Sequence, residues 1–304
     1  IVLCNQRIGK FLIFLGSTLQ LHYAIPMLST PPILFNRRRL RMRAARCAAN
    51  FLQHDFLWHE AATRAEESLS FIARRFPRIL AFGAHAFTAP EGSTLVHAGF
   101  APLGQRPHLI VDEELLPFAP ARFDAALCLL NLHAVNDVPG VLAQLHQALK
   151  PDGLLMAVVF GGETLRELRS IFAATESARS GGVSPRVAPF MDVRDGGALL
   201  QRAGFALPVA DSELLSVSYE NLFALMDDIR GVGQSNMLQQ QVQHFTPRGF
   251  FFDAAKRYAD TYGDAEGRIH ATVEFITLTG WKPAANQQQP AKRGSGKVSL
   301  KDVF

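Results

Sequence analysis

Between residues 79 and 160 the chain alternates short apolar runs with helical periodicity, and this alternation constrains the fold more than any other feature. Five apolar runs of strand length occur there, at residues 79–82, 94–98, 108–111, 125–130 and 154–160. Apolar residues at helical spacing lie between the last two runs. A strand, a crossover helix and a second strand favour parallel pairing, because the helix returns the chain to the same sheet. We therefore predict an α/β fold with a doubly wound, mostly parallel sheet and helices on both faces, which binds ligands beyond the carboxyl ends of its strands.

The flanking segments extend this core in both directions. We expect two amphipathic helices within residues 33–76, where apolar side chains recur among charged ones. Beyond the core we expect helices at residues 163–175, 195–203 and 222–229, and strands at 206–211 and 270–281. The predicted organisation is an N-terminal extension (1–32), N-terminal helices (33–76), one main domain (77–285) and a polar C-terminal tail (286–304).

Charge and composition argue against two classes of partner. The net charge is +4, but residues 1–50 hold eight Lys or Arg and no acidic residue, so the remainder has 23 basic against 27 acidic residues. Such a body lacks the broad basic surface that nucleic acid binding requires. Three separated cysteines and a scattered set of histidines, of which His54 and His59 come closest to a ligand pattern, predict no metal site.

The first 32 residues allow several interpretations. The apolar stretch 11–28 is interrupted by polar residues, so it does not have the composition of a bilayer span. Together with the acid-free arginine run behind it, the segment is typical of a signal or mitochondrial transit peptide, or of sequence upstream of the fold. The arginines of 37–46 indicate a solvated helix face, or a contact with acidic lipid or a partner. We expect at most peripheral membrane contact.

Several motifs resemble one family of proteins. They are "DEELLPF" (112–118), "FDAALCLLNLHAVNDVPGVLAQLHQALKPDGLL" (123–155), "FGGETLRELR" (160–169), "GGVSPRVAPF" (181–190) and "GVGQSN" (231–236). The chain resembles the class I S-adenosylmethionine-dependent methyltransferases, and within them the respiratory complex I assembly factors of methyltransferase fold. The resemblance covers roughly residues 33–304 and makes 77–285 the methyltransferase-like domain. It implies S-adenosylmethionine as cofactor and a protein substrate such as a complex I subunit, in the bacterial cytoplasm or the mitochondrial matrix.

The family's cofactor motifs are only partly retained. The first strand should end in an acidic residue and a loop with three glycines, but the matching positions hold Ala81, Gly83, His85 and Phe87. We expect the side chains at 85 and 87 to fill space that the cofactor needs. The acidic residue that would accept both ribose hydroxyls is replaced by Gly99.

Other positions match the family better. Asp112 stands where the family accepts the adenine amino group, and the resemblance implies that Gly83, Asp112, Glu113 and Leu116 contact the cofactor. Asn131 and His133 follow the fourth strand, where the methyl-transfer cleft lies, so they are the candidate catalytic residues. A loop histidine bonded to backbone is the simpler interpretation of His133.

Three functions remain open from the sequence. The first is an enzyme that modifies a protein side chain, by methylation or by hydroxylation, during complex I assembly. The second is a catalytically silent fold retained as an assembly module, which the lost motif residues favour. The third is an O-methyltransferase for a carrier-bound acid in biotin synthesis. The oligomeric state is not fixed by any of these patterns.

Overall fold

The computed structural model describes two units of the chain. The described residues are 2–5, 10–13, 21–23, 33–101, 107–241, 245–285 and 287. The first unit, Ile1–Ile33, contains the antiparallel strands β1 (Val2–Asn5), β2 (Lys10–Ile13) and β3 (Leu21–Tyr23). The second unit, Leu34–Phe304, contains every other element and all the sites described below.

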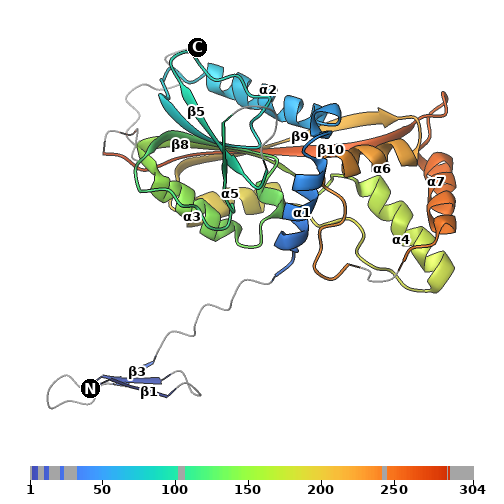
Figure 1. Ribbon diagram of the computed structural model, residues 1–304, viewed down its shortest axis with the longest axis horizontal. Helices are drawn as coiled ribbons and strands as arrows, with labels where there is room; N and C mark the ends of the chain where they lie inside the picture. Colours follow the sequence, from blue (N-terminus) through green and yellow to red (C-terminus); the bar gives the residue numbers. More distant parts are fainter. Residues whose placement is uncertain are drawn as a thin grey trace, which may run out of the picture. The chain divides into compact units, whose positions relative to one another are not determined.

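A seven-stranded sheet forms the centre of the second unit (Figure 1). Its strands run in the order β6-β5-β4-β7-β8-β10-β9, with β10 antiparallel to both of its neighbours and the other pairs parallel. The strand bounds are β4 (Arg78–Phe82), β5 (Thr94–Gly99), β6 (His108–Ile110), β7 (Phe123–Leu129), β8 (Leu149–Phe160), β9 (Ala206–Tyr219) and β10 (Ile269–Trp281). The predicted doubly wound, mostly parallel sheet is confirmed.

Helices cover both faces of this sheet, as predicted. Successive side chains of a strand point to opposite faces, so Ile79 and Ala81 of β4 join the apolar cluster under α2, whereas Leu80 and Phe82 join the cluster under α3 and α5. The helix bounds are α1 (Arg37–Cys47), α2 (Phe56–Ser70), α3 (Val138–Ala148), α4 (Arg166–Ser180), α5 (Val193–Arg202), α6 (Leu222–Gly231) and α7 (Arg248–Tyr262). Every helix in the described part of the chain is too short or too polar to cross a bilayer.

The helices α4, α6 and α7 lie together beside the sheet (Figure 1), and they form a third apolar cluster with the start of β10. Helix α7 adds to the predicted elements, and its buried residues Phe250, Ala254 and Tyr258 are spaced four apart, as one helical face requires. The predicted strand at 206–211 extends to Tyr219, because β9 pairs with β10 along nearly its whole length.

Two local expectations need correction. The "KPDG" segment (150–153) has the proline and glycine that favour a turn after α3, but it lies within β8 as an irregularity in its pairing with β7. Phe123 pairs with Leu149 and Ala125 pairs with Leu154, and the extra residues are accommodated by Asp152 with φ 61°. The helix predicted from residue 163 begins at Arg166, after a turn at residues 162–165.

Candidate functional site

A cavity of about 130 Å³ lies at the carboxyl ends of β4, β5 and β7, and we call it the tip cavity. Gly83 follows β4, Gly99 ends β5 and Asn131 lies two residues beyond β7, so three adjacent parallel strands each supply part of the wall. Arg37 of α1 and Glu113 also line it. This is the position at which an open parallel sheet binds its ligand.

The fold itself requires the glycine at the start of this site. Gly83 has φ +62°, a left-handed conformation that side chains rarely adopt, and a Cβ there would lie 2.0 Å from the carbonyl oxygen of Leu129. The close approach of the β4 and β7 ends therefore explains Gly83 without any ligand.

His85 and Phe87 do not fill the tip cavity, which corrects the sequence expectation. After the left-handed turn at Gly83 the chain turns toward α2, where Phe87 is buried among core side chains. The His85 Nε2 atom lies 2.7 Å from Asp55 Oδ2, so this histidine ties the loop to the start of α2. Neither side chain lines the cavity.

Asn131 and Glu113 are two of the polar residues that line the tip cavity. Both the Oδ1 and the Nδ2 atoms of Asn131 are buried without a hydrogen-bond partner, an arrangement that costs free energy unless a ligand supplies the partners. Burial raises the pKa of Glu113, an effect that its contact with Arg37 opposes. The unsatisfied amide is the clearest sign in this cavity of a missing polar ligand.

Arg37 anchors α1 against the acidic loop that follows β6. Its Nη2 atom donates to Asp112 Oδ1 at 2.7 Å and to Glu113 Oε2 at 2.6 Å, and its Nη1 atom donates to the Ala134 carbonyl at 3.0 Å. The guanidinium also lies over the Phe100 ring, 4.3 Å from its centroid. Burial alone would raise the pKa of Asp112, but the Arg37 hydrogen bond contributes most to a net pKa below the ordinary value.

Helix α1 is also held toward its other end, by Arg43. The Arg43 Nη1 atom donates to the carbonyls of Ser235 and Asn236, at 2.6 and 2.7 Å. These two residues belong to the segment 231–236. Helix α1 therefore links the acidic loop to the "GVGQSN" segment across the tip cavity.

His133 is absent from the lining of the tip cavity but contacts Gln234, which is part of that lining. It is buried, its ring centroid lies 4.8 Å from that of Phe160 and 6.0 Å from that of Phe190, and its Nε2 atom is 3.2 Å from Gln234 Oε1. Burial lowers the pKa of His133 to about 4, so the ring is neutral at neutral pH. An Nε2–H group that donates to Gln234 leaves Nδ1 with the lone pair, and Nδ1 is buried without a partner.

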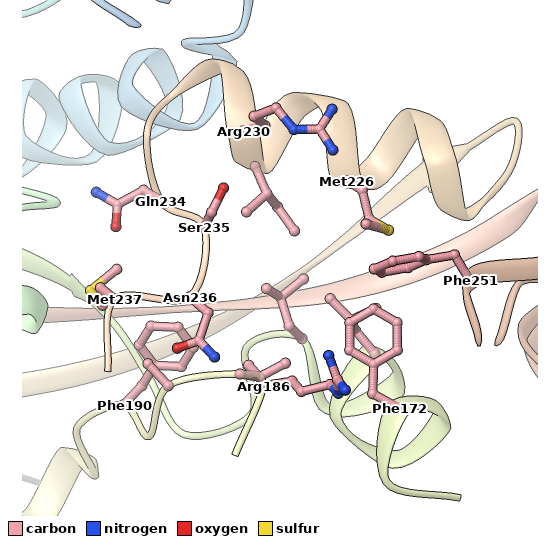
Figure 2. A pocket seen from close by; sticks show the side chains of 15 residues that line it. Phe172, Arg186, Phe190, Met226, Arg230, Gln234, Ser235, Asn236, Met237 and Phe251 are labelled. Atoms are coloured by element: carbon pink, nitrogen blue, oxygen red, sulfur yellow. The ribbon is translucent and has the colours of Figure 1, made fainter. Parts of the chain in front are cut away.

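Two further cavities adjoin this region. The side cleft, about 200 Å³, lies between α4, α6, the segment 186–190 and the segment 234–237 (Figure 2). The inner chamber, about 60 Å³, lies between the start of α2, helix α6 and the N-terminal part of β10. Gln234 lines the tip cavity, the side cleft and the inner chamber, so its side chain stands at their junction.

The structure brings together half of the residues proposed from the sequence. Gly83, Glu113 and Asn131 line the tip cavity. The residues Asp112, Leu116 and His133 do not: Asp112 faces the arginines of α1, Leu116 is partly buried against the core and donates its N–H to Gln144 Oε1 at 2.8 Å, and His133 contacts Gln234.

Two residues of the site were missed. Arg37 carries no signal in the sequence that separates it from the other arginines of α1. Gln234 stands in a motif that the resemblance already singled out. Among the residues that the structure describes, no group of three or more His, Cys, Asp or Glu could hold a metal ion.

Comparisons with known proteins agree with this geometry. Residues 83–157 match the methyltransferase domain family. The chain is 34% identical over 284 residues to the arginine-hydroxylase NDUFAF5, mitochondrial, of Danio rerio, covering 88% of each chain. It is 34% identical over 303 residues to the protein of that name from Rattus norvegicus, covering 91% of this chain and 87% of the relative. It is 32% identical over 272 residues to the malonyl-[acyl-carrier protein] O-methyltransferase of Xylella fastidiosa, covering 83% and 90%. The chain therefore belongs to the class I S-adenosylmethionine-dependent methyltransferase superfamily and, within it, to the family of the NDUFAF5 proteins.

Proposed function

We propose that this chain binds S-adenosylmethionine in the tip cavity and modifies a side chain of a protein substrate during assembly of respiratory complex I. The single observation that carries the proposal is the tip cavity itself, placed at the strand ends where the superfamily binds its cofactor and lined by an asparagine with no partner. The names of the NDUFAF5 relatives support an arginine as the target and the mitochondrion, rather than the bacterial cytoplasm, as the compartment.

The residues present fit part of the cofactor. The two orphaned amide atoms of Asn131 and the carboxylate of Glu113 supply one donor and several acceptors for a polar ligand. At the end of β5, Gly99 supplies no carboxylate for a ribose diol. The cavity of about 130 Å³ is also smaller than the roughly 300–1,000 Å³ of most ligand pockets, so we expect Arg37 to shift with α1 when the cofactor enters.

The chain's own residues have separate roles in this proposal. When bound, the cofactor supplies an electrophilic methyl group on a sulfonium. Asn131 and Glu113 would hold it, and Arg37 would close the cavity from the side of α1. His133 is a positioning residue, because it contacts Gln234 rather than the cavity. Asp112, which faces Arg37, would act through that arginine, and Leu116 would support the loop from the core.

A catalytically silent assembly module is the second candidate. Two observations favour it: β5 ends in a glycine rather than an acidic residue, and Arg37 already satisfies the carboxylates of the acidic loop. A carrier-bound acid is an alternative substrate, because one relative is named a malonyl-[acyl-carrier protein] O-methyltransferase.

Calorimetry with S-adenosylmethionine separates these candidates. We expect the unaltered chain to bind it, and Asn131→Ala to bind it about tenfold more weakly, since one hydrogen bond contributes about 0.5–1.5 kcal/mol and this amide offers two. Asn50→Ala, at an exposed asparagine outside the cavity, is the control. A folded chain that releases no heat with millimolar cofactor would favour the silent module.

Turnover is tested next. With cofactor, dioxygen, a reductant and complex I subunits, mass spectrometry of the subunits distinguishes a methyl group transferred from the cofactor from an oxygen atom inserted at the expense of dioxygen and the reductant. Methyl transfer to malonyl-acyl-carrier protein instead of to a subunit would contradict the proposed protein substrate.

A further inference from the structure

The inner chamber has the lining of a site for an organic cation. It is largely enclosed by apolar and aromatic side chains, among them Trp58, Phe160, Phe190 and Tyr219. Among the described residues that line it, Asp228 of α6 is the only carboxylate, and no Lys or Arg is present. Aromatic side chains around a single carboxylate attract a cation through the ring quadrupoles and the opposite charge together.

Asp228 is positioned from two sides. The His54 Nδ1 atom lies 2.7 Å from its Oδ1 atom, and the Asp228 side chain keeps 30% of its surface exposed. Burial raises the pKa of Tyr219, and the nearby Asp228 raises it further, so the tyrosine stays a neutral hydroxyl. The aspartate is therefore oriented within the chamber and still accessible.

The size of the chamber selects a small head group. Its 60 Å³ is about twice the volume of one water molecule in the liquid, roughly 30 Å³. The side cleft adjoins it, since Leu165, Phe190, Ile229 and Gln234 line both, and this cleft holds about 200 Å³. A long side chain could therefore place its head group in the chamber and its stem in the cleft. Figure 2 shows Phe190 and Gln234 along this cleft.

We propose that the inner chamber receives the guanidinium group of the target side chain, and that Asp228 is the specificity-determining residue for its positive charge. The inference rests on the proposed function, because the chamber shares Gln234 with the tip cavity that would hold the cofactor. A guanidinium suits the site better than an ammonium, because it is planar, more weakly hydrated and able to pack on aromatic rings. A neutral isostere could donate an N–H to the carboxylate but would lack the attraction between opposite charges.

Fluorescence of Trp58 provides a direct assay. The chain has two tryptophans, so Trp281→Phe leaves Trp58, which lines both the chamber and the tip cavity, as the sole reporter. The probes are Nα-acetylarginine amide and its neutral isostere, Nα-acetylcitrulline amide. We expect the arginine compound to bind about tenfold more tightly or better, as a charge-assisted hydrogen bond supplies. Equal binding of the two compounds would overturn the proposal, and this comparison needs no change at Asp228.

Two neighbouring aspartates give a matched pair of variants. Asp228→Asn is expected to abolish the preference for arginine over citrulline. Asp227→Asn is expected to retain it, since Asp227 is 66% exposed and pairs with Arg230. A purely structural role for Asp228 would weaken both probes alike, and a preference that survives Asp228→Asn would refute the assignment.

Calorimetry on the same samples separates this inference from the proposed function. Heat of cofactor binding without a preference for arginine would overturn only the guanidinium site. Absence of cofactor binding would overturn the proposed function.

Discussion

The buried imidazole of His133 predicts a measurable dependence of stability on pH. Burial lowers its pKa from 6.5 to about 4. At a pH between these two values, the histidine is protonated in the unfolded chain and neutral in the folded chain. Stability from this group is complete above the unfolded pKa and is lost as pH falls toward the folded pKa. The two values give a loss of about 2 kcal/mol at about pH 5 relative to neutral pH.

Denaturant unfolding of the unaltered chain and of His133→Gln measures this loss. Glutamine has no proton to gain in this range, so the free energy of unfolding of the variant should fall by about 2 kcal/mol less between pH 7 and about pH 5. His59→Gln, which removes a histidine whose side chain is 64% exposed, is the control. Equal slopes for His133→Gln and the unaltered chain would refute the neutral, buried imidazole.

Three further substitutions, two of them with a control variant, test the packing and charges around the site. Gly83→Ala should destabilise the fold by more than about 2 kcal/mol, because strain at positive φ adds to a clash with backbone. The control Gly92→Ala meets open space and should cost only the strain, about 1 kcal/mol. Thermal unfolding compares the two variants, and equal losses of stability would contradict the clash at Gly83. Arg37→Met leaves the buried carboxylate of Glu113 without its cation and should lower the free energy of unfolding by about 3–5 kcal/mol. The control Arg41→Met, at a side chain 54% exposed, should lower it by less than about 1 kcal/mol in the same denaturation assay. Glu176→Gln should lower the free energy of unfolding by about 1.5–3 kcal/mol. Hydrogen bonds from Arg186 and Ser184 outweigh partial burial and hold the pKa of Glu176 at about 2, so the stability from this carboxylate is lost as pH falls from 4.5 toward 2. If the variant and the unaltered chain lost the same free energy of unfolding over this pH range, the prediction would be contradicted.

The sheet could be predicted from the sequence because buried parallel strands are continuous apolar runs. The structure has no helix between β4 and β5 at residues 83–93, where Pro90 and Gly92 disfavour one. Helix α7 was not predicted, although its apolar residues Phe250, Ala254 and Tyr258 recur every four residues, as on one face of a helix.

The site was harder to predict than the sheet. The direction of the chain after Gly83 depends on one left-handed residue, and it decides whether His85 and Phe87 face the cavity or α2. Arginines on one helix look alike in a sequence, and only the tertiary position of Asp112 and its neighbours distinguishes Arg37 from the rest. Interactions between residues far apart in the chain are the part that local patterns leave out.

The place of Gln234 at the junction of three cavities has a thermodynamic consequence. A guest that moves this amide in one compartment changes the shape of the other two, so the affinities of two guests become linked, and the linkage is equal in both directions. Gln234 also contacts His133, so protonation of that imidazole in acid would move the amide and enter the same coupling. One uncharged side chain can thereby make the affinity for each of two molecules depend on whether the other is bound.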